Sequence, residues 1–382
     1  MKRVECLDGL RGLAALWVLF GHAMLLTGFK LPILGQPDMG VDLFILLSGF
    51  LMTFQYQLRS SFEDWGQVET WKAFWVRRFF RIAPLFYVLL TVAIMFGSSI
   101  YADRQLIDSF FGNTQQLSTR YNDSSLTNVL MHVSFLFGLV PSYAFRTPLP
   151  DWSLGLEMQF YAAFPIVILV VRRVGWIKGG IGVALVGAVV GLAAPRLGAH
   201  FPMPSFLPLK LHLFLSGMMI AVALHNRSRL LFYLAMALLC AALPIGGPHN
   251  LRHLVVRESL VFGFFALVHF RSSKVVDRAS RLLGSTVFHW LGELSFGIYL
   301  LHLLLMHRVV AWTIQTYGTT ISPLTRFSIV VLIVGAAGYT LAFATYRLVE
   351  QPGQKLGRIV LKRLRFEKRQ AVQVQAEELA AP

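Results

Sequence analysis

Apolar stretches of roughly 17 to 25 residues recur along the whole chain, separated by short polar or basic segments. Each stretch is long enough to cross a hydrocarbon core of about 30 Å as an α-helix, in which all backbone groups are satisfied. The pattern predicts an all-α fold, a polytopic transmembrane helical bundle. The apolar segments are 9–29, 39–58, 82–100, 126–142, 153–171, 179–194, 208–224, 229–245, 254–270, 287–307 and 326–347.

Composition agrees with this pattern, because 55% of the residues are hydrophobic and only 14% are charged. Soluble domains carry about 25% charged residues. A net charge of +16 could suggest a nucleic-acid partner, but the basic residues gather between apolar segments and in the stretch 355–369. That distribution is typical of positive-inside retention with contact to anionic lipids. We therefore expect membrane lipids, and no nucleic acid, among the partners.

Charge also decides between two topologies. If every apolar segment crossed the membrane, the basic clusters at 172–173 and 271–281 would be exported. If 126–142 does not cross, about ten spans remain, and most of the 35 lysines and arginines face the cytoplasm with both termini. We therefore predict about ten spanning helices plus one membrane-associated segment. Residues 101–152 then form one long external excursion, a length that is often functional.

The predicted domains are a transmembrane domain, 1–352, and a basic cytoplasmic tail, 353–382, whose final stretch has the composition of a disordered segment. The N-terminus lacks a signal-peptide cleavage pattern, so it is interpreted as a retained first helix. Cys6 and Cys240 are the only cysteines and lie in or beside apolar segments. They indicate neither a disulfide framework nor a cysteine metal site. The histidines show no metal-binding spacing either, and we predict no metal.

Ionisable side chains inside membrane spans are costly and therefore indicate function. In the first span, LDGLRGLAALWVLFGH, Arg11 and His22 are eleven residues apart and share one helical face, roughly 16 Å apart along the axis. Imidazole can take a proton from a hydroxyl near neutral pH, since its ordinary pKa is about 6.5. Spacing alone leaves open whether His22 is a catalytic base or a buried structural histidine.

The second span begins with MGVDLFILLSGF, which carries the acid Asp42 and the small pair Ser48 and Gly49. Asp42 could orient His22, or it could bond backbone groups near the helix N-terminus. The small pair is typical of close helix packing, and packing is the expected role of Ser48.

Arg78 and Arg81 lie three residues apart in FWVRRFFRIAPLFY, on one helical face at the predicted cytoplasmic surface. Forked guanidinium groups placed in this way suit a phosphate-rich ligand such as coenzyme A. Basic residues at cytoplasmic helix ends also commonly serve topology and contact lipid phosphates. Both interpretations stay open.

The segment PDWSLGLEMQFYAAFP places Trp152 at the predicted external interface, and it places Glu157 and Tyr161 four residues apart on one face. A tryptophan there usually anchors the helix in the interface. Glu157 is an acid that enters an apolar span, and it could fix the His22 tautomer or contact the acceptor.

Late in the chain, HWLGELSFGIYLLHLLL places Ser295, Tyr299 and His302 at steps of four and three, with Glu293 just before them. The three residues form one polar stripe, which must face the protein interior. There it could line a tunnel or hold helices together.

Five motifs in this order resemble the membrane-bound acyltransferase 3 family: LDGLRGLAALWVLFGH, GVDLFILLSGF, RRFFRIAPLFY, WSLGLEMQFY and LGELSFGIYLLH. The likeness extends from Leu7 to about Pro352. That family acylates, usually acetylates, bacterial surface and secreted glycans, and sometimes macrolides. The resemblance implies that Arg11 and His22 form the essential pair of the first span. It also implies that Arg78 and Arg81 serve acyl-CoA use and that Glu157 is an important acid.

Larger members of the family carry a periplasmic SGNH hydrolase-like domain, which we do not expect here, so the nearest architecture is a stand-alone exopolysaccharide-type enzyme. The resemblance implies a multi-pass protein of the bacterial cytoplasmic (inner) membrane that uses acetyl-CoA or another acyl-CoA as donor substrate, with no permanently bound cofactor. Its acceptor would be a glycan or a lipid-linked sugar. The acceptor, the acyl length and the oligomeric state stay undetermined by the sequence.

The resulting hypothesis places donor phosphates near Arg78 and Arg81 and the pantetheine arm along the first span past Arg11. His22 either deprotonates the acceptor hydroxyl or carries the acyl group transiently. Asp42, Trp152 and Tyr161, together with Tyr299 and His302, would support the acceptor side. The alternatives are a transporter or flippase, whose matching broken repeats are not visible, and acylation of a small molecule such as a macrolide.

Overall fold

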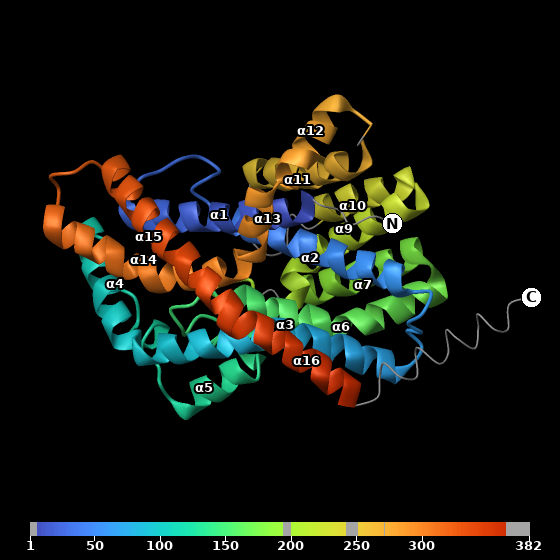
Figure 1. The fold of residues 1–382 in the computed structure, drawn as a ribbon, viewed down its shortest axis with the longest axis horizontal. Helices are drawn as coiled ribbons and strands as arrows, with labels where there is room; N and C mark the ends of the chain where they lie inside the picture. The colour runs from blue at the N-terminus through green and yellow to red at the C-terminus, as the bar shows by residue number, and fades with distance from the viewer. Residues whose placement is uncertain (1–5, 194–199, 242–250, 271, 364–382) are drawn as a thin grey trace, which may run out of the picture.

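The computed structural model describes residues 6–193, 200–241, 251–270 and 272–363, which form helices and, among these residues, no strand (Figure 1). The all-α prediction is confirmed. The helices are α1 (Cys6–Thr27), α2 (Pro37–Arg59), α3 (Val68–Met95), α4 (Gly97–Phe111), η1 (Ser118–Arg120), α5 (Leu126–Val133), η2 (Leu136–Leu139), α6 (Trp152–Val174), α7 (Trp176–Ala193), α9 (Leu207–Asn226), α10 (Arg229–Ala241), α11 (Leu251–His269), α12 (Lys274–Leu283), α13 (Thr286–Glu293), α14 (Ser295–Tyr317), α15 (Pro323–Thr345) and α16 (Gln351–Arg363). A π-helical turn, Tyr346–Glu350, joins α15 to α16.

Seven helices of the described chain are long and apolar enough to cross a membrane: α1, α2, α3, α6, α9, α14, and α15 continued by α16. These helices support a multi-pass membrane protein. The described apolar parts of α7 and α10 are shorter, and α11 carries charged residues such as Arg257. The count of about ten spans and the side on which the termini lie therefore stay predictions. The end of the predicted tail, 364–382, and the Cys240 side chain lie outside the described part of the chain.

The segment 126–142 is not one continuous helix. It contains α5, of 8 residues, and η2, of 4 residues. Eight residues rise only about 12 Å, which is too short to cross a bilayer. Leu126 and Leu130 of α5 are exposed, whereas Asn128 and His132 of the same helix are buried. A helix that turns its leucines outward and its polar groups inward suits a segment associated with the membrane.

The predicted span 287–307 is interrupted, which corrects the expectation of a single helix there. Helix α13 ends at Glu293 and α14 begins at Ser295. The Ser295 hydroxyl donates a hydrogen bond to the Gly292 carbonyl oxygen across this break, at 2.6 Å. Short-range bonding of this kind competes with regular helix bonding and often bends a helix. Glu293 therefore lies at a corner between two helices, not within a span.

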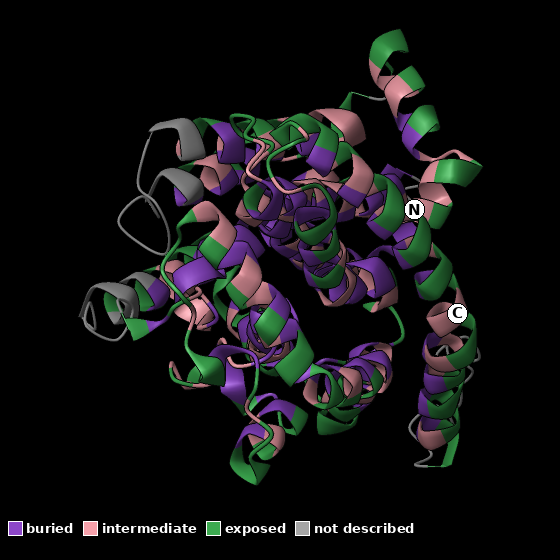
Figure 2. Ribbon diagram, turned by 90° about the vertical axis from the view of Figure 1, so that its left-hand side faces the viewer, coloured by how far each residue is buried: buried purple, intermediate pink, exposed green. Residues whose placement is uncertain are grey.

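Small residues set the closest helix contacts in the bundle, whose buried residues gather in its middle (Figure 2). A Cβ atom on Gly49 of α2 would overlap the Phe214 carbonyl oxygen of α9. A Cβ atom on Gly217 of α9 would likewise overlap the Leu46 carbonyl oxygen of α2. The predicted close approach at Gly49 is confirmed, and the close contact positions the α2 residues that face inward.

Asp42 is held by two cations and makes no hydrogen bond to His22, whereas its acceptor-side role stays a prediction. One carboxylate oxygen accepts a hydrogen bond from the Lys210 ammonium at 2.7 Å, and the other accepts one from Arg257 Nε at 2.7 Å. All three side chains are buried. Because a buried charge needs a partner, the two cations hold this acid in an ion cluster that joins α2, α9 and α11.

Candidate functional site

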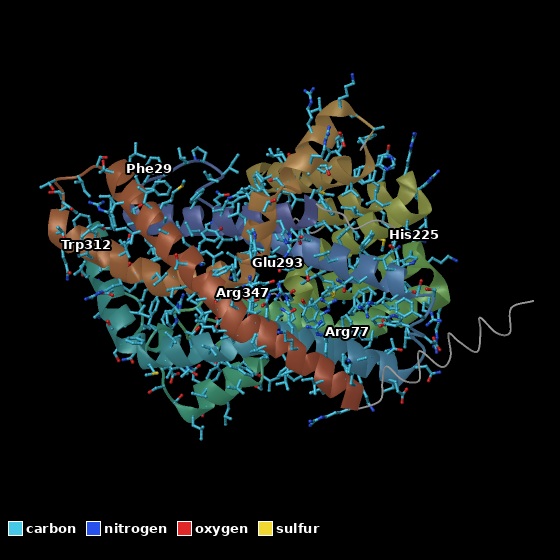
Figure 3. All side chains as sticks on the ribbon, viewed as in Figure 1. Phe29, Arg77, His225, Glu293, Trp312 and Arg347 are labelled. Atoms are coloured by element: carbon cyan, nitrogen blue, oxygen red, sulfur yellow. The ribbon has the colours of Figure 1, made fainter. Side chains whose placement is uncertain are left out.

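An internal cavity of about 570 Å³ lies between α1, α2, α3, α6 and α14. This volume falls within the range of about 300–1,000 Å³ that small-molecule sites occupy. Glu293, near the centre of the molecule in Figure 3, is one of its lining residues. The polar lining residues are Asp8, Arg11, Ser48, Gln55, Arg78, Arg81, Ser153, Glu157, Tyr161, Glu293, Ser295, Tyr299 and Gln354.

The three predicted arginines all line this cavity, although they come from two helices. Arg78 donates a hydrogen bond to Gln55 and lies over the ring of Tyr161, 5.8 Å from its centroid. Arg81 donates a hydrogen bond to Glu350 at 3.2 Å. Arg11 makes no hydrogen bond or ion pair with any other described residue. The Arg78 guanidinium is therefore bonded to a neutral side chain, and the Arg81 guanidinium is bonded to an acid. The Arg11 guanidinium is available to a ligand.

Glu157 also lines the cavity, but its contacts differ from those considered for it. Its Oε1 atom accepts a hydrogen bond from the Ser48 hydroxyl at 3.0 Å and another from the Tyr161 hydroxyl. Ser48 is therefore a polar cavity residue, and the interpretation of pure packing was wrong. Glu157 orients Tyr161, whose ring lies beside Arg78, instead of orienting His22.

Tyr299 closes one side of the cavity. Its hydroxyl donates a hydrogen bond to the Pro150 carbonyl oxygen at 2.7 Å and shares a second hydrogen bond with the Ser153 hydroxyl at 2.7 Å. Its ring packs edge-on against Phe44, another lining residue, with the centroids 5.7 Å apart. Tyr299 thus forms a wall of the cavity that is tied to the start of α6.

His22 and His302 lie beyond this wall and do not line the cavity. The Tyr299 and His302 ring centroids are 6.1 Å apart. His22 Nδ1 and His302 Nε2 are 3.1 Å apart. The predicted stripe of Ser295, Tyr299 and His302 is buried, as expected. The cavity that Arg11 lines does not include His22, and the expected path from Arg11 to His22 stays a prediction.

Trp152 is the first residue of α6, is buried, and does not line the cavity. The chain just before it is fixed by a polar network. Arg120 donates to the Thr147 carbonyl oxygen at 2.5 Å, and the Thr147 hydroxyl donates to Asp151 at 2.6 Å. Burial lowers the pKa of Arg120 to about 10 and raises the pKa of the Asp151 carboxyl group. The predicted external excursion is therefore anchored at the start of α6.

Asp8, His289 and Glu293 form the one group in the described residues whose ligand atoms lie close enough to hold a metal ion, within 4.8 Å of one another. His289 Nδ1 is 3.1 Å from an Asp8 oxygen, and Glu293 accepts a hydrogen bond from the Tyr346 hydroxyl at 2.6 Å. The absence of a metal stays a prediction, and this group is the place to test it.

Sequence reasoning missed Gln55, Glu293 and Glu350 as partners or neighbours of the arginines. Glu350 is 1% exposed and is the last residue of the π-helical turn. Such turns occur frequently at functional sites, but no residue pattern marks one in advance. A weak signal was available, because Glu350 is an acid at the end of an apolar segment.

A family model described as an acyltransferase domain matches residues 4–347. Among curated proteins, the peptidoglycan O-acetyltransferase OatA of Listeria monocytogenes is 25% identical over 382 aligned residues, covering 93% of this chain and 56% of the relative. A putative membrane-bound transacylase, BcsY, of Komagataeibacter xylinus is 34% identical over 173 residues, covering 44% of this chain and 38% of the relative.

A putative O-acetyltransferase of Staphylococcus aureus (strain COL) is 28% identical over 206 residues, covering 50% of this chain and 30% of the relative. The chain therefore spans little more than half the length of the Listeria protein and less of the other two. No solved structure matches the chain.

Proposed function

Because this chain belongs to the acyltransferase 3 family, we propose that it is a membrane O-acyltransferase. In this proposal it transfers an acyl group, in the simplest case acetyl, from cytoplasmic acyl-CoA to a hydroxyl of a glycan or lipid-linked sugar outside the cytoplasm. One observation carries the proposal. Three arginines converge on a cavity whose far wall, Tyr299, separates it from a pair of hydrogen-bonded histidines.

The arginine side chains of the cavity are suited to bind the acyl-CoA donor. Coenzyme A carries several phosphate groups, and guanidinium groups bind phosphate through paired charge-assisted hydrogen bonds. Arg11 is available for such a contact, and Arg81 can exchange Glu350 for a phosphate oxygen. The apolar lining, which includes Leu47, Leu51 and Ile82, suits the pantetheine arm and the acyl chain.

His22 is suited to act as the base in the transfer step. His22 Nε2 takes the proton of the acceptor hydroxyl while that oxygen attacks the thioester carbonyl carbon. The carbon–sulfur bond then breaks, and the same nitrogen returns the proton to the departing thiolate. The products are an acylated acceptor and free coenzyme A. In the proposed mechanism the thioester reaches His22 past Tyr299, which lines the cavity and whose ring centroid is 6.1 Å from that of His302.

Family membership favours this function over a transporter. The printed name of the Listeria relative points to peptidoglycan as the acceptor for that protein. A cell-wall glycan is therefore the first acceptor to test here, and a macrolide is the second.

The test uses purified full-length protein in lipid nanodiscs with acetyl-CoA labelled in its acetyl group. The wild-type protein should release the coenzyme A thiol. It should also transfer the label to peptidoglycan fragments or to a macrolide. In His22→Gln both should fall by about 10² to 10⁴, the usual contribution of a general base. Donor binding should survive, because His22 does not line the cavity.

The matched control is His225→Gln, since His225 is an exposed histidine at the end of α9 (Figure 3). It should turn over normally. Near-normal turnover in His22→Gln would make His22 a structural histidine and remove the proposed mechanism.

A further inference from the structure

Two histidines face backbone carbonyl oxygens in the same way. His22 Nδ1 is 3.0 Å from the Val18 carbonyl oxygen, and His302 Nδ1 is 3.1 Å from the Ile298 carbonyl oxygen. A carbonyl oxygen can only accept a hydrogen bond, so each Nδ1 must carry a hydrogen. In the neutral rings, both Nε2 atoms therefore hold a lone pair.

Only one assignment of donor and acceptor fits the hydrogen bond between the two rings. His302 Nε2 lies 3.1 Å from His22 Nδ1. Because His302 Nε2 carries no hydrogen, it accepts, and the His22 Nδ1 hydrogen is shared between it and the Val18 oxygen. If His302 Nε2 donated instead, His22 Nδ1 would carry no hydrogen and would face the Val18 carbonyl oxygen without a hydrogen bond.

We propose that His302 is a positioning residue that fixes His22 in the Nδ1–H tautomer and leaves His22 Nε2 as the base. This inference rests on the proposed function, in which His22 takes the acceptor proton. When that proton binds, His302 Nε2 and the Val18 oxygen together support the imidazolium. The proton does not move on to His302, because His22 Nδ1 would then lose the hydrogen that it donates to Val18. It leaves through Nε2, to the thiolate.

In the described part of the chain, no carboxylate makes a hydrogen bond to His22, and His302 is the one side chain that does. Glu157 Oε1 accepts its hydrogen bonds from Ser48 and Tyr161 instead. His302 is 1% exposed, so water does not compete for this bond.

The test compares His302→Leu, His302→Gln and His307→Gln in nanodiscs. Leucine fills space but cannot accept, so kcat should fall about tenfold to a hundredfold, as expected for a lost hydrogen bond to a charged group. Glutamine can accept through its amide oxygen and should restore most of kcat. Donor binding should not change in either variant. His307→Gln is matched, since His307 Nδ1 also faces a carbonyl oxygen, that of Leu303, at 2.7 Å.

Nitrogen-15 resonance of histidine-labelled protein reports the tautomer directly. We expect wild-type His22 to carry its hydrogen on Nδ1. In His302→Leu the Val18 oxygen alone holds that hydrogen, so the share of the Nε2–H tautomer should rise. A wild-type hydrogen on Nε2, or normal kcat in a folded His302→Leu, would overturn the inference. If His302→Leu is active while His22→Gln is inactive, only this inference fails. If His22→Gln is active, the proposed function fails.

Discussion

Arg77, Arg78 and Arg81 are close in the sequence, but their side chains have different surroundings. Arg78 and Arg81 line the cavity, whereas Arg77 pairs with Glu63 outside it. We expect Arg78→Gln and Arg81→Gln each to weaken acetyl-CoA binding about tenfold to a hundredfold, the effect of losing a charge-assisted hydrogen bond. Binding of labelled acetyl-CoA to nanodiscs measures this. Arg77→Gln is the matched control and should bind nearly normally.

If Arg78→Gln and Arg81→Gln bind the donor as tightly as Arg77→Gln, the cavity arginines serve topology and lipid contact, and the donor lies elsewhere.

Asp42 should contribute to the stability of the fold and not to catalysis. Replacing it with alanine leaves Lys210 and Arg257 buried without their anion, and breaking a buried pair typically costs about 3–5 kcal/mol. We expect a clear fall in the thermal unfolding midpoint of Asp42→Ala in detergent. Asp277→Ala is the control, because its partner Arg281 is 71% exposed and such pairs contribute little. Equal midpoints for both variants would contradict this role.

At the scale of elements, the π-helical turn Tyr346–Glu350 joins α15 to α16, whose Gln354 lines the cavity. A π turn holds one residue more than an α turn. Deleting Leu348, which is 75% exposed, should convert it to regular helix. Because the π turn takes up its extra residue within that one turn, the residues after the deletion would keep nearly the same face relative to α15, and Glu350 would stay beside Arg81.

We therefore expect the Leu348 deletion to stay folded and to bind acetyl-CoA nearly as tightly as the wild type, as binding and thermal unfolding in detergent would show. Leu348→Ala keeps the chain length and should bind normally. A large fall in affinity in the deletion variant alone would show that donor binding depends on the extra residue of the π turn.

At the scale of the whole molecule, the described chain begins in α1 and ends in α16 toward the same side of the bundle (Figure 1). This arrangement is compatible with both termini on one side of the membrane, and the cytoplasmic side stays a prediction. Single cysteines at positions 115 and 145 should then react with an impermeant thiol reagent added outside the inner membrane. A cysteine in α12 should react only after permeabilisation. Labelling of position 145 from the cytoplasm alone would overturn the topology and place Trp152 and Glu157 on the wrong side.

The hydropathy pattern alone determined the fold class, because a bilayer accepts few structures and a helix that crosses it must be long and apolar. The sequence also singled out five polar residues that line the cavity, namely Arg11, Arg78, Arg81, Glu157 and Tyr299. Ionisable groups within apolar segments are costly, and each one is therefore visible against its surroundings.

Only the tertiary structure decided which of these groups meet. Asp42 and Glu157 were both acids in apolar spans, yet Asp42 joins Lys210 and Arg257 while Glu157 joins Ser48 and Tyr161. Partners of this kind lie more than a hundred residues apart in the chain, except for Tyr161, and helix periodicity gives a face but not the neighbour across it. The His22–His302 contact has the same origin, because it depends on how α1 packs beside α14.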